Sequence, residues 1–194
     1  ETETVTLSRS MVDRMIESSE RQLKLLDSLL AIQLSDAEGL QLTLEPTLLR
    51  PFVDDAIQGL DPLLLENRVS VNNLVPDDLQ SVNIDTFQLR RVIENLICNA
   101  MKHNPPDICI TIRATVEDQM VRCSIEDDGV GIPAEDCERM FQRYVQGSQS
   151  RRSLGVGLGL YLCRQIVKAH GGEIGVTSAL NQGAKFWFTL PVAQ

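Results

Sequence analysis

The sequence has little histidine, no long apolar run and more negative than positive charge. Its two histidines, His103 and His170, exclude a histidine-rich metal site and limit histidine chemistry to these two side chains or a partner's. The formal net charge of −9 excludes broad binding to nucleic acid or anionic membranes, because both need a basic surface. The longest apolar runs, such as 29–32 and 63–65, are too short to span a bilayer, and no signal-peptide pattern opens the chain. Because Glu1 rather than Met stands first, we expect a piece of a longer protein.

Paired cysteines are also missing. The five cysteines are widely spaced and form no C-x-x-C pair, and most have apolar neighbours, as Cys109 has in Ile108 and Ile110. This pattern disfavours disulfides and a zinc site. It predicts buried free thiols in a reducing compartment.

The first part of the chain is predicted to be one long helix over residues 8–34, which contain neither glycine nor proline. Residues spaced by four and three form a heptad seam that one serine interrupts: Val12, Ile16, Ser19, Leu23, Leu26 and Leu30. An amphipathic helix has to bury such a stripe, either in a helical bundle between subunits or against its own domain. Residues 35–39 are typical of a linker.

The rest of the chain mixes short strands and helices. Strands are predicted at 40–44, 69–71, 81–84, 107–116, 120–127, 173–178 and 184–190, and helices at 47–60, 86–103, 134–142 and 158–170. Pro62 interrupts or restarts the first of these helices, and Asp85 and Gln88 form a capping-box-like start for the second. Residues 143–156 are predicted to form a mobile loop. The pattern predicts an α+β fold, a two-layer sandwich in which helices cover one face of a mixed, mainly antiparallel sheet.

The helix over 86–103 carries an unusual polar face. Arg91, Asn95, Asn99 and Lys102 are spaced by four, four and three residues and therefore share one side of the helix. A carboxamide oxygen is a hard, neutral ligand for Mg²⁺, and it suits a site where a triphosphate already supplies negative charge. An ordinary polar helix face explains the same residues equally well.

Two glycine-containing segments follow. Asp127-Asp128-Gly129-Val130-Gly131-Ile132-Pro133 places a carboxylate at a strand end beside two residues without Cβ, where a flat heterocycle can lie while Asp127 accepts a hydrogen bond from its amino group. A tight turn is the alternative, because Asp-Gly pairs favour turns. Gly155-Val156-Gly157-Leu158-Gly159-Leu160 leads into a helix, whose N-terminal N–H groups attract phosphate. It lacks the Gly-Lys-Ser/Thr of a P-loop, and no parallel βαβ unit supports a dinucleotide fingerprint.

In this order, the three segments resemble the ATP-binding catalytic domain of sensor histidine kinases, within the wider family that includes gyrase, Hsp90 and MutL ATPases. Residues 95–103 match the N box, 127–131 the first glycine box and 155–160 the second glycine box. Phe141-Gln142-Arg143-Tyr144 is similar to the F box. Residues 169–174 and 183–186 are similar to the closing helix–strand and terminal strand signals, so the resemblance covers about residues 40–192.

The resemblance implies ATP and Mg²⁺ as ligands and assigns roles to individual residues. Asn99 is the expected principal Mg²⁺ ligand with Asn95 assisting, Lys102 and His103 approach the phosphates, and Asp127 contacts the adenine amino group. Gly129 and Gly131 allow close approach of the base, and Gly155, Gly157 and Gly159 cradle phosphates. Further expected contacts of the nucleotide are Ile132, Phe141, Tyr144, Val156, Leu158 and Leu160. Arg143, Arg151 and Arg152 either supply positive charge or are solvated, and His170 closes its helix.

The resemblance also implies the domain organisation and the partners. Residues 1–34 resemble the second helix of a dimerisation and phosphoacceptor hairpin, residues 35–39 are the linker, and residues 40–194 are the catalytic domain. The expected partners are a second copy of the chain, a helix carrying the acceptor histidine and the receiver domain of a response regulator. The expected location is cytoplasmic, without nucleic-acid binding and with membrane attachment only through segments outside this chain.

Two departures from the family leave other functions open. Val156 replaces a small hydroxyl residue that is often found between the glycines, so one potential hydrogen bond to phosphate is missing. The gyrase and Hsp90 branch has a glutamate where Asn95 stands, and Glu94 lies roughly 100° away around the helix. The sequence therefore favours a kinase. The alternatives are a gyrase-type Mg-ATPase, a degenerate non-catalytic module and an anti-sigma serine kinase, which the heptad helix disfavours.

Overall fold

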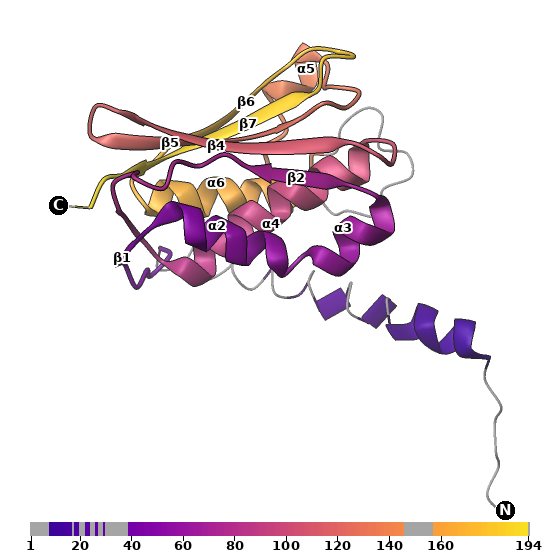
Figure 1. Ribbon diagram of the computed structural model, residues 1–194. Coiled ribbons are helices and arrows are strands. Elements are labelled where there is room, and N and C mark those ends of the chain that lie inside the picture. The colour runs from indigo at the N-terminus through magenta and orange to yellow at the C-terminus, as the bar shows by residue number, and fades with distance from the viewer. Residues whose placement is uncertain are drawn as a thin grey trace, which may run out of the picture.

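The computed structural model describes residues 8–16, 18–19, 22–23, 26, 29, 39–145 and 157–193. The described residues from 9 to 29 are helical, as predicted for this part of the chain. Their first part projects away from the packed layers (Figure 1), whereas Leu29 is partly buried against the core. Val12, Ile16, Leu23 and Leu26 of the predicted seam have exposed side chains. The other residues of the predicted helix, and residues 35–38 of the predicted linker, lie outside the described residues.

A five-stranded mixed sheet forms one layer. The strands are β2 (Ser70–Asn73), β4 (Cys109–Glu117), β5 (Met120–Asp127), β6 (Ile174–Ser178) and β7 (Ala184–Pro191), in the order β2-β4-β5-β7-β6. β2 runs parallel to β4, and the other neighbouring strands are antiparallel. β1 (Glu45–Thr47) and β3 (Val82–Ile84) form a separate antiparallel pair.

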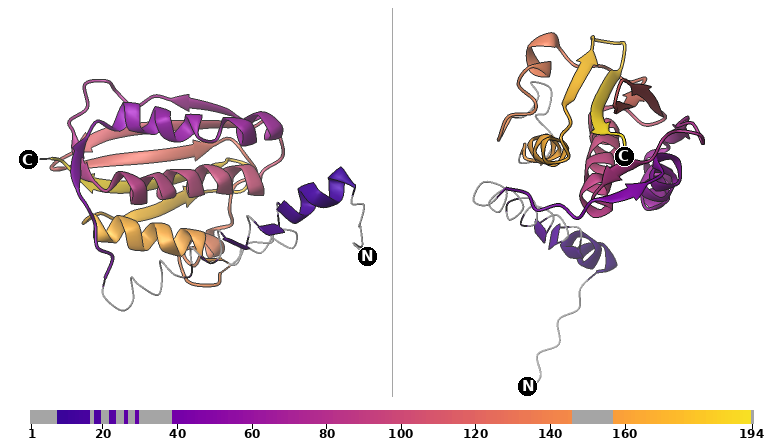
Figure 2. Two further views of the ribbon diagram at one scale, coloured as in Figure 1. Left: turned by 90° about the horizontal axis from the view of Figure 1, so that it is seen from below. Right: turned by 90° about the vertical axis from the view of Figure 1, so that its left-hand side faces the viewer.

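Helices form the second layer, on one face of the sheet (Figures 1 and 2). They are α2 (Leu49–Gln58), α3 (Asp61–Asn67), α4 (Thr86–His103) and α6 (Gly159–Ala169), with a short α5 (Ala134–Cys137) beside the end of β6. Alternate residues of β7, such as Phe186, Phe188 and Leu190, are buried beneath the helices. This arrangement confirms the predicted α+β two-layer sandwich with a mainly antiparallel sheet.

α4 lies in the middle of the helical layer and begins as the sequence predicts. Asp85 is its N-cap, and Asp85 Oδ1 accepts a hydrogen bond from the backbone N–H of Gln88 at 3.0 Å. One side of the helix is fully packed in the core: Leu89, Val92, Ile93, Leu96, Ile97 and Ala100. The helix ends at His103, before the Asn104-Pro105-Pro106 segment that cannot continue it. Because this apolar side of α4 is packed in the core, the polar side of the helix faces away from the core.

Three expectations differ from the structure. The strand predicted at 40–44 is wrong, because the first strand begins at Glu45 and pairs with β3, while Leu44 is exposed. The helix predicted at 134–142 ends at Cys137 and gives way to turns. The parallel pairing of β2 with β4 was not predicted, since alternation of side chains does not reveal strand direction. Within the described residues, no helix is both long and apolar enough to cross a membrane.

Candidate functional site

The polar face of α4 presents its two asparagines side by side. Asn95 and Asn99 are one turn apart and half-buried, whereas Lys102 and His103 are exposed on the last turn of the helix. Neighbouring protein atoms that desolvate the imidazole, and the positive charge of Lys102, both lower the pKa of His103. His103 is therefore a neutral imidazole at pH 7, and the positive charge at this helix end comes from Lys102.

The N-terminus of α6 meets this face at Asn95. A Cβ built on Gly159, the first residue of α6, would lie 3.3 Å from Asn95 Oδ1. Asn95 also lies near the sulfur of Cys163. Burial is the larger effect on this thiol and raises its pKa to about 12, whereas Asn95 slightly lowers the pKa. Leu158, the N-cap residue, makes no side-chain cap hydrogen bond, and the first N–H groups of a helix such as α6 attract an anionic ligand.

Asp127, at the end of β5, is buried with 6% of its surface exposed. Its Oδ1 accepts hydrogen bonds from Asn104 Nδ2 and from the backbone N–H of Gly129, each at 3.0 Å. Burial is the largest effect on this carboxyl group and raises its pKa. The hydrogen bonds from Gly129, Asn104 and Ala184 act in the opposite direction. Asp127 is thus a desolvated, oriented acceptor that is suited to a ligand N–H group.

Asn104 is a part of this site that sequence reasoning missed. It is the C-cap of α4, and its Oδ1 accepts a hydrogen bond from Val130 N at 2.8 Å while its Nδ2 donates to Asp127. It lies five residues after Asn99, so it is not on the polar face of α4 that Asn95 and Asn99 share. The signal that could have found it is an asparagine between a helix end and a Pro-Pro pair, where its backbone geometry is restricted.

Gly129 and Gly131 of the first glycine box stand where neighbouring protein atoms leave no room for a side chain. A Cβ on Gly129 would lie 1.9 Å from Asn104 Oδ1. Gly131 has a φ of +71°, and a Cβ there would lie 2.0 Å from the carbonyl oxygen of Ala179. Both positions therefore exclude a side chain because of their protein neighbours, whereas the resemblance attributed their identity to a bound base.

The F-box residues differ in what they contact. Phe141 is buried and packs edge-to-face on Phe186 with ring centroids 6.4 Å apart, so its ring belongs to the core. Tyr144 is exposed at a φ of 62°, and its N–H donates to the carbonyl oxygen of Gly157 at 3.1 Å. Leu158 is also buried and Leu160 packs partly against the core.

Arg143 joins the same segment to α6. Its Nη2 donates to the hydroxyl of Tyr161 at 2.6 Å, and its guanidinium lies 4.5 Å from the centre of that ring. The cation is therefore held at the first turn of α6, close to the N-terminus that faces Asn95. The predicted ligand residues Arg151, Arg152, Gly155 and Val156 lie outside the described residues.

His170 is buried away from these groups at the C-terminal end of α6. Its Nε2 accepts a hydrogen bond from Asp85 N at 3.0 Å, and its Nδ1 lies 2.8 Å from the carbonyl oxygen of Ile166. These contacts fit a neutral ring with its proton on Nδ1, which donates to Ile166. His170 thus closes α6 as expected, by linking it to the N-cap of α4 and not through a positive charge.

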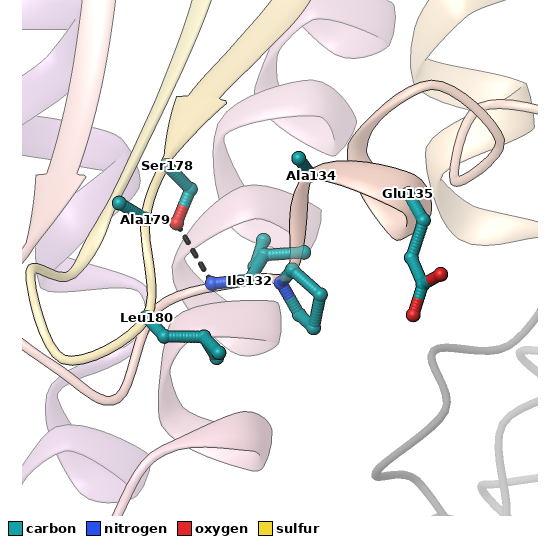
Figure 3. Close-up of a pocket in the computed structure, with 7 residues that line it drawn as sticks. Ile132, Ala134, Glu135, Ser178, Ala179 and Leu180 are labelled. Atoms are coloured by element: carbon teal, nitrogen blue, oxygen red, sulfur yellow. Dashed lines mark hydrogen bonds between the residues drawn. The ribbon is translucent and has the colours of Figure 1, made fainter.

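Ile132 contributes to a shallow pocket beside the glycine-rich loop (Figure 3). The pocket is lined by Ile132, Pro133, Ala134, Glu135, Ser178, Ala179 and Leu180. The N–H of Ile132 donates to Ser178 Oγ at 2.8 Å, and the same hydroxyl donates to the carbonyl oxygen of Gly183 at 2.6 Å. These bonds fix the loop after Asp127 against the turn between β6 and β7.

The arrangement fits a nucleotide held by amide and carboxylate groups. The described residues contain no group of three or more His, Cys, Asp or Glu side chains that could hold a metal ion. Asn95 and Asn99 provide neutral oxygen donors on one face of α4, which suits Mg²⁺ when phosphate oxygens complete its coordination. Asp127 contacts Asn104, the C-cap of the same helix, so a base would lie near this end of α4.

Comparisons with known proteins agree with this geometry. The family model described as histidine kinase-, DNA gyrase B-, and HSP90-like ATPase matches residues 84–194. The adaptive-response sensory kinase SasA of Synechococcus sp. (strain JA-2-3B'a(2-13)) is 34% identical over 192 residues, which are 96% of this chain and 51% of that protein. The sensor histidine kinase WalK of Bacillus subtilis is 31% identical over 89% of this chain and 29% of its own length. The chain thus spans about half the length of this SasA protein and of a second one from another Synechococcus strain.

Solved structures of histidine kinases share this fold. Full-length ShkA in complex with AMPPNP superposes with a TM-score of 0.85 and 28% identity, over 100% of this chain and 40% of that chain. Histidine kinase ThkA in complex with the response regulator protein TrrA superposes with a TM-score of 0.74 over 97% of this chain and 53% of that chain. Its sequence identity is 20%, so this match concerns the fold alone.

Proposed function

The chain belongs to the family of histidine kinase-, DNA gyrase B- and HSP90-like ATPases, and from this membership we propose that it is the catalytic portion of a sensor histidine kinase. It binds Mg-ATP and transfers the γ-phosphoryl group to a histidine outside this chain, for relay to a response regulator. Residues 40–194 form the ATP-binding domain, residues 35–39 the linker and residues 1–34 one helix of a dimerisation hairpin. The protein acts in the cytoplasm.

The observation that best supports this function is the meeting of three separate sequence segments around α4. Asn95 approaches Gly159 at the start of α6, and Asn104 contacts Asp127 and the loop after it. The polar side of α4 therefore carries groups that can bind phosphate and metal. Asn104, the C-cap of α4, contacts Asp127, whose carboxylate can accept a hydrogen bond from a base. Such an assembly positions a bound triphosphate, which is most of what phosphoryl transfer requires from a protein.

Each residue has a specific part in this proposal. When bound, Mg-ATP supplies the transferable phosphoryl group. Asn99 and Asn95 hold the metal through their carboxamide oxygens, and Lys102 neutralises charge on the phosphates. Asp127 accepts a hydrogen bond from the adenine amino group. Glu94, which lies roughly 100° around the helix from Asn95, is not directed at the same point, so hydrolysis by a glutamate base is disfavoured.

The partners follow from the same family. The exposed seam on the N-terminal helix supports a homodimer in the full-length protein, since Val12 and Ile16 have exposed apolar side chains. The complex of ThkA with TrrA supports the receiver domain of a response regulator as a second partner. The phosphoacceptor helix is the third, because neither His103 nor His170 is placed as an acceptor.

The test is phosphorylation in trans. The chain is mixed with Mg-ATP labelled at the γ-phosphate and with a separate helical hairpin that carries an acceptor histidine, and acid-labile phosphate on the hairpin is measured. We expect transfer by the parent, and a loss of at least about tenfold, or about 1.4 kcal/mol, in Asn99→Asp, because the new carboxylate lacks the amide donor and places negative charge beside the triphosphate. Asn73→Asp, which alters a similar amide remote from the site, is the control.

Other outcomes identify the alternatives. Tight ATP binding without transfer to any hairpin argues against the kinase. Steady phosphate release without an acceptor, abolished by Glu94→Ala, identifies a gyrase-type Mg-ATPase instead. No nucleotide binding in calorimetry identifies a non-catalytic module.

A further inference from the structure

We propose that Asn104 is a positioning residue that determines base selectivity by fixing the carboxylate of Asp127. This inference rests on the proposed function, in which Asp127 contacts the adenine amino group. Asn104 makes three hydrogen bonds with a single carboxamide. Its Nδ2 donates to Asp127 Oδ1 and to the carbonyl oxygen of Ala100, each at 3.0 Å, and its Oδ1 accepts from Val130 N at 2.8 Å.

These contacts decide which oxygen of Asp127 meets the base. A carboxylate oxygen has two lone pairs in its plane. Oδ1 already accepts from Asn104 Nδ2 and from Gly129 N, so its capacity is filled. The amino group of a base therefore has to be met by Oδ2. Asn104 provides the side-chain contact that sets the rotation of the carboxylate and so aims Oδ2, together with the backbone contacts of Gly129 and Ala184.

An amide satisfies both sides of this junction, because it carries a donor and an acceptor in one short side chain. The carboxylate needs an N–H donor, and the backbone N–H of Val130 needs an acceptor within the same short side chain. A carboxylate at this position would lack the donor and repel Asp127, and an apolar side chain would leave both partners unpaired. The missing Cβ at Gly129 leaves the space that the amide occupies, because a Cβ there would lie 1.9 Å from Asn104 Oδ1.

Asn104 also ties base recognition to α4. Its bond to Ala100 holds the amide against the last turn of the helix, which carries Lys102 and directly follows Asn99. The base-contacting carboxylate is thereby fixed relative to the phosphate-binding face. A structural cap alone would stabilise the helix end without any effect on which base binds.

The test compares two nucleotides by calorimetry: Mg-ATP and purine riboside triphosphate, which lacks the 6-amino group. The parent is expected to prefer ATP, and Asn104→Leu, of nearly the same shape, is expected to lower the ratio of the two affinities about tenfold, which corresponds to about 1.4 kcal/mol. Asn73→Leu is the matched control. Asn73 donates to Asp54 Oδ1 and to the carbonyl oxygen of Arg50 and accepts from Val75 N, an equivalent network remote from the site. It should leave the ratio unchanged.

A second variant keeps the test decisive if Asn104→Leu does not fold. Asn104→Asp retains the shape and the acceptor for Val130 but loses the donor to Asp127, and it should also reduce the ratio. A parent that prefers ATP together with unchanged ratios in the folded Asn104 variants overturns the role of Asn104 alone. A parent that binds both nucleotides equally overturns the base contact of Asp127, and the role of Asn104 with it.

Discussion

At the scale of single residues, Asp127 shows how one carboxyl group can be both buried and prepared for a ligand. Burial raises its pKa, while hydrogen bonds from Gly129, Asn104 and Ala184 favour the charged form and partly offset this effect. The net result is a carboxyl group that loses its proton at a higher pH than an ordinary aspartate. Its ionisation is therefore linked to folding as well as to the ligand.

The raised pKa of Asp127 predicts a particular dependence of stability on pH. The folded state retains a proton that the unfolded state has already released, so stability falls as pH rises from the ordinary aspartate range through the raised pKa. Asp127→Asn removes this contribution. We expect the free energy of unfolding of the variant to improve relative to the parent as pH rises through that interval. Urea denaturation at several pH values measures the difference.

The control for this prediction is Asp54→Asn, which removes an exposed carboxylate that accepts a hydrogen bond from Asn73. Its stability difference from the parent should not change in the same direction over the same interval. A difference between Asp127→Asn and the parent that is constant with pH would contradict the linkage.

The pKa of His103 should depend on the charge of Lys102. Desolvation and the charge of Lys102 lower its pKa, in that order. Lys102→Gln removes the second effect, so the pKa of His103 should rise while remaining below the ordinary value. Because the chain has two histidines, proton NMR can follow the ring signals during titration. Lys168→Gln, on the last turn of α6, is the control, and an unchanged pKa in Lys102→Gln would contradict the prediction.

At the scale of elements, the site depends on how the loop after β5 fits the end of α4. Gly129 has no room for a side chain because Asn104 fills the space. Gly129→Ala should therefore displace Asn104 or the loop, lower the free energy of unfolding by about 1–3 kcal/mol and weaken ATP binding. Thermal unfolding and calorimetry measure the two effects.

The control is Gly59→Ala, at the end of α2. A Cβ on Gly59 would lie 3.5 Å from its nearest neighbour, which is an ordinary contact, and its φ of −61° suits alanine. This variant should keep both stability and ATP affinity. Equal effects of the two substitutions would show that the crowding at Gly129 is not the cause.

The same elements show what the sequence could and could not predict. α4 was predicted with its ends because its cap, its apolar stripe and the following prolines are local signals. The parallel contact of β2 with β4, and the contact of Asn104 with Asp127, join residues far apart in the sequence. Local patterns carry no information on such contacts. The leucine alternation at 40–44 was misleading because a strand also needs a partner, and the pairing with β3 begins at Glu45.

At the scale of the whole molecule, the packing of α4 against α6 brings sequence motifs that are far apart in the chain together in one site. Asn95 lies against the start of α6 near the site, and His170 joins the end of α6 to the start of α4 through Asp85. Asp85 Oδ2 also accepts a hydrogen bond from Thr43 N, in the segment that leads into the domain. The N-terminal segment is thus connected to both helices of the candidate site through one residue.

The N-terminal helix gives the last prediction, which concerns self-association. Val12 and Ile16 are exposed, one turn apart and on the predicted seam, where burial of each apolar side chain would contribute about 1.5–3 kcal/mol. Val12→Ser with Ile16→Ser should therefore weaken self-association of the chain at least about tenfold. It should leave ATP affinity unchanged, because both residues lie outside the site. Sedimentation measures the first effect and calorimetry the second. Arg14→Ser, on the opposite side of the same helix, should alter neither, and a parent that stays monomeric at high concentration would show that this helix alone does not form the interface.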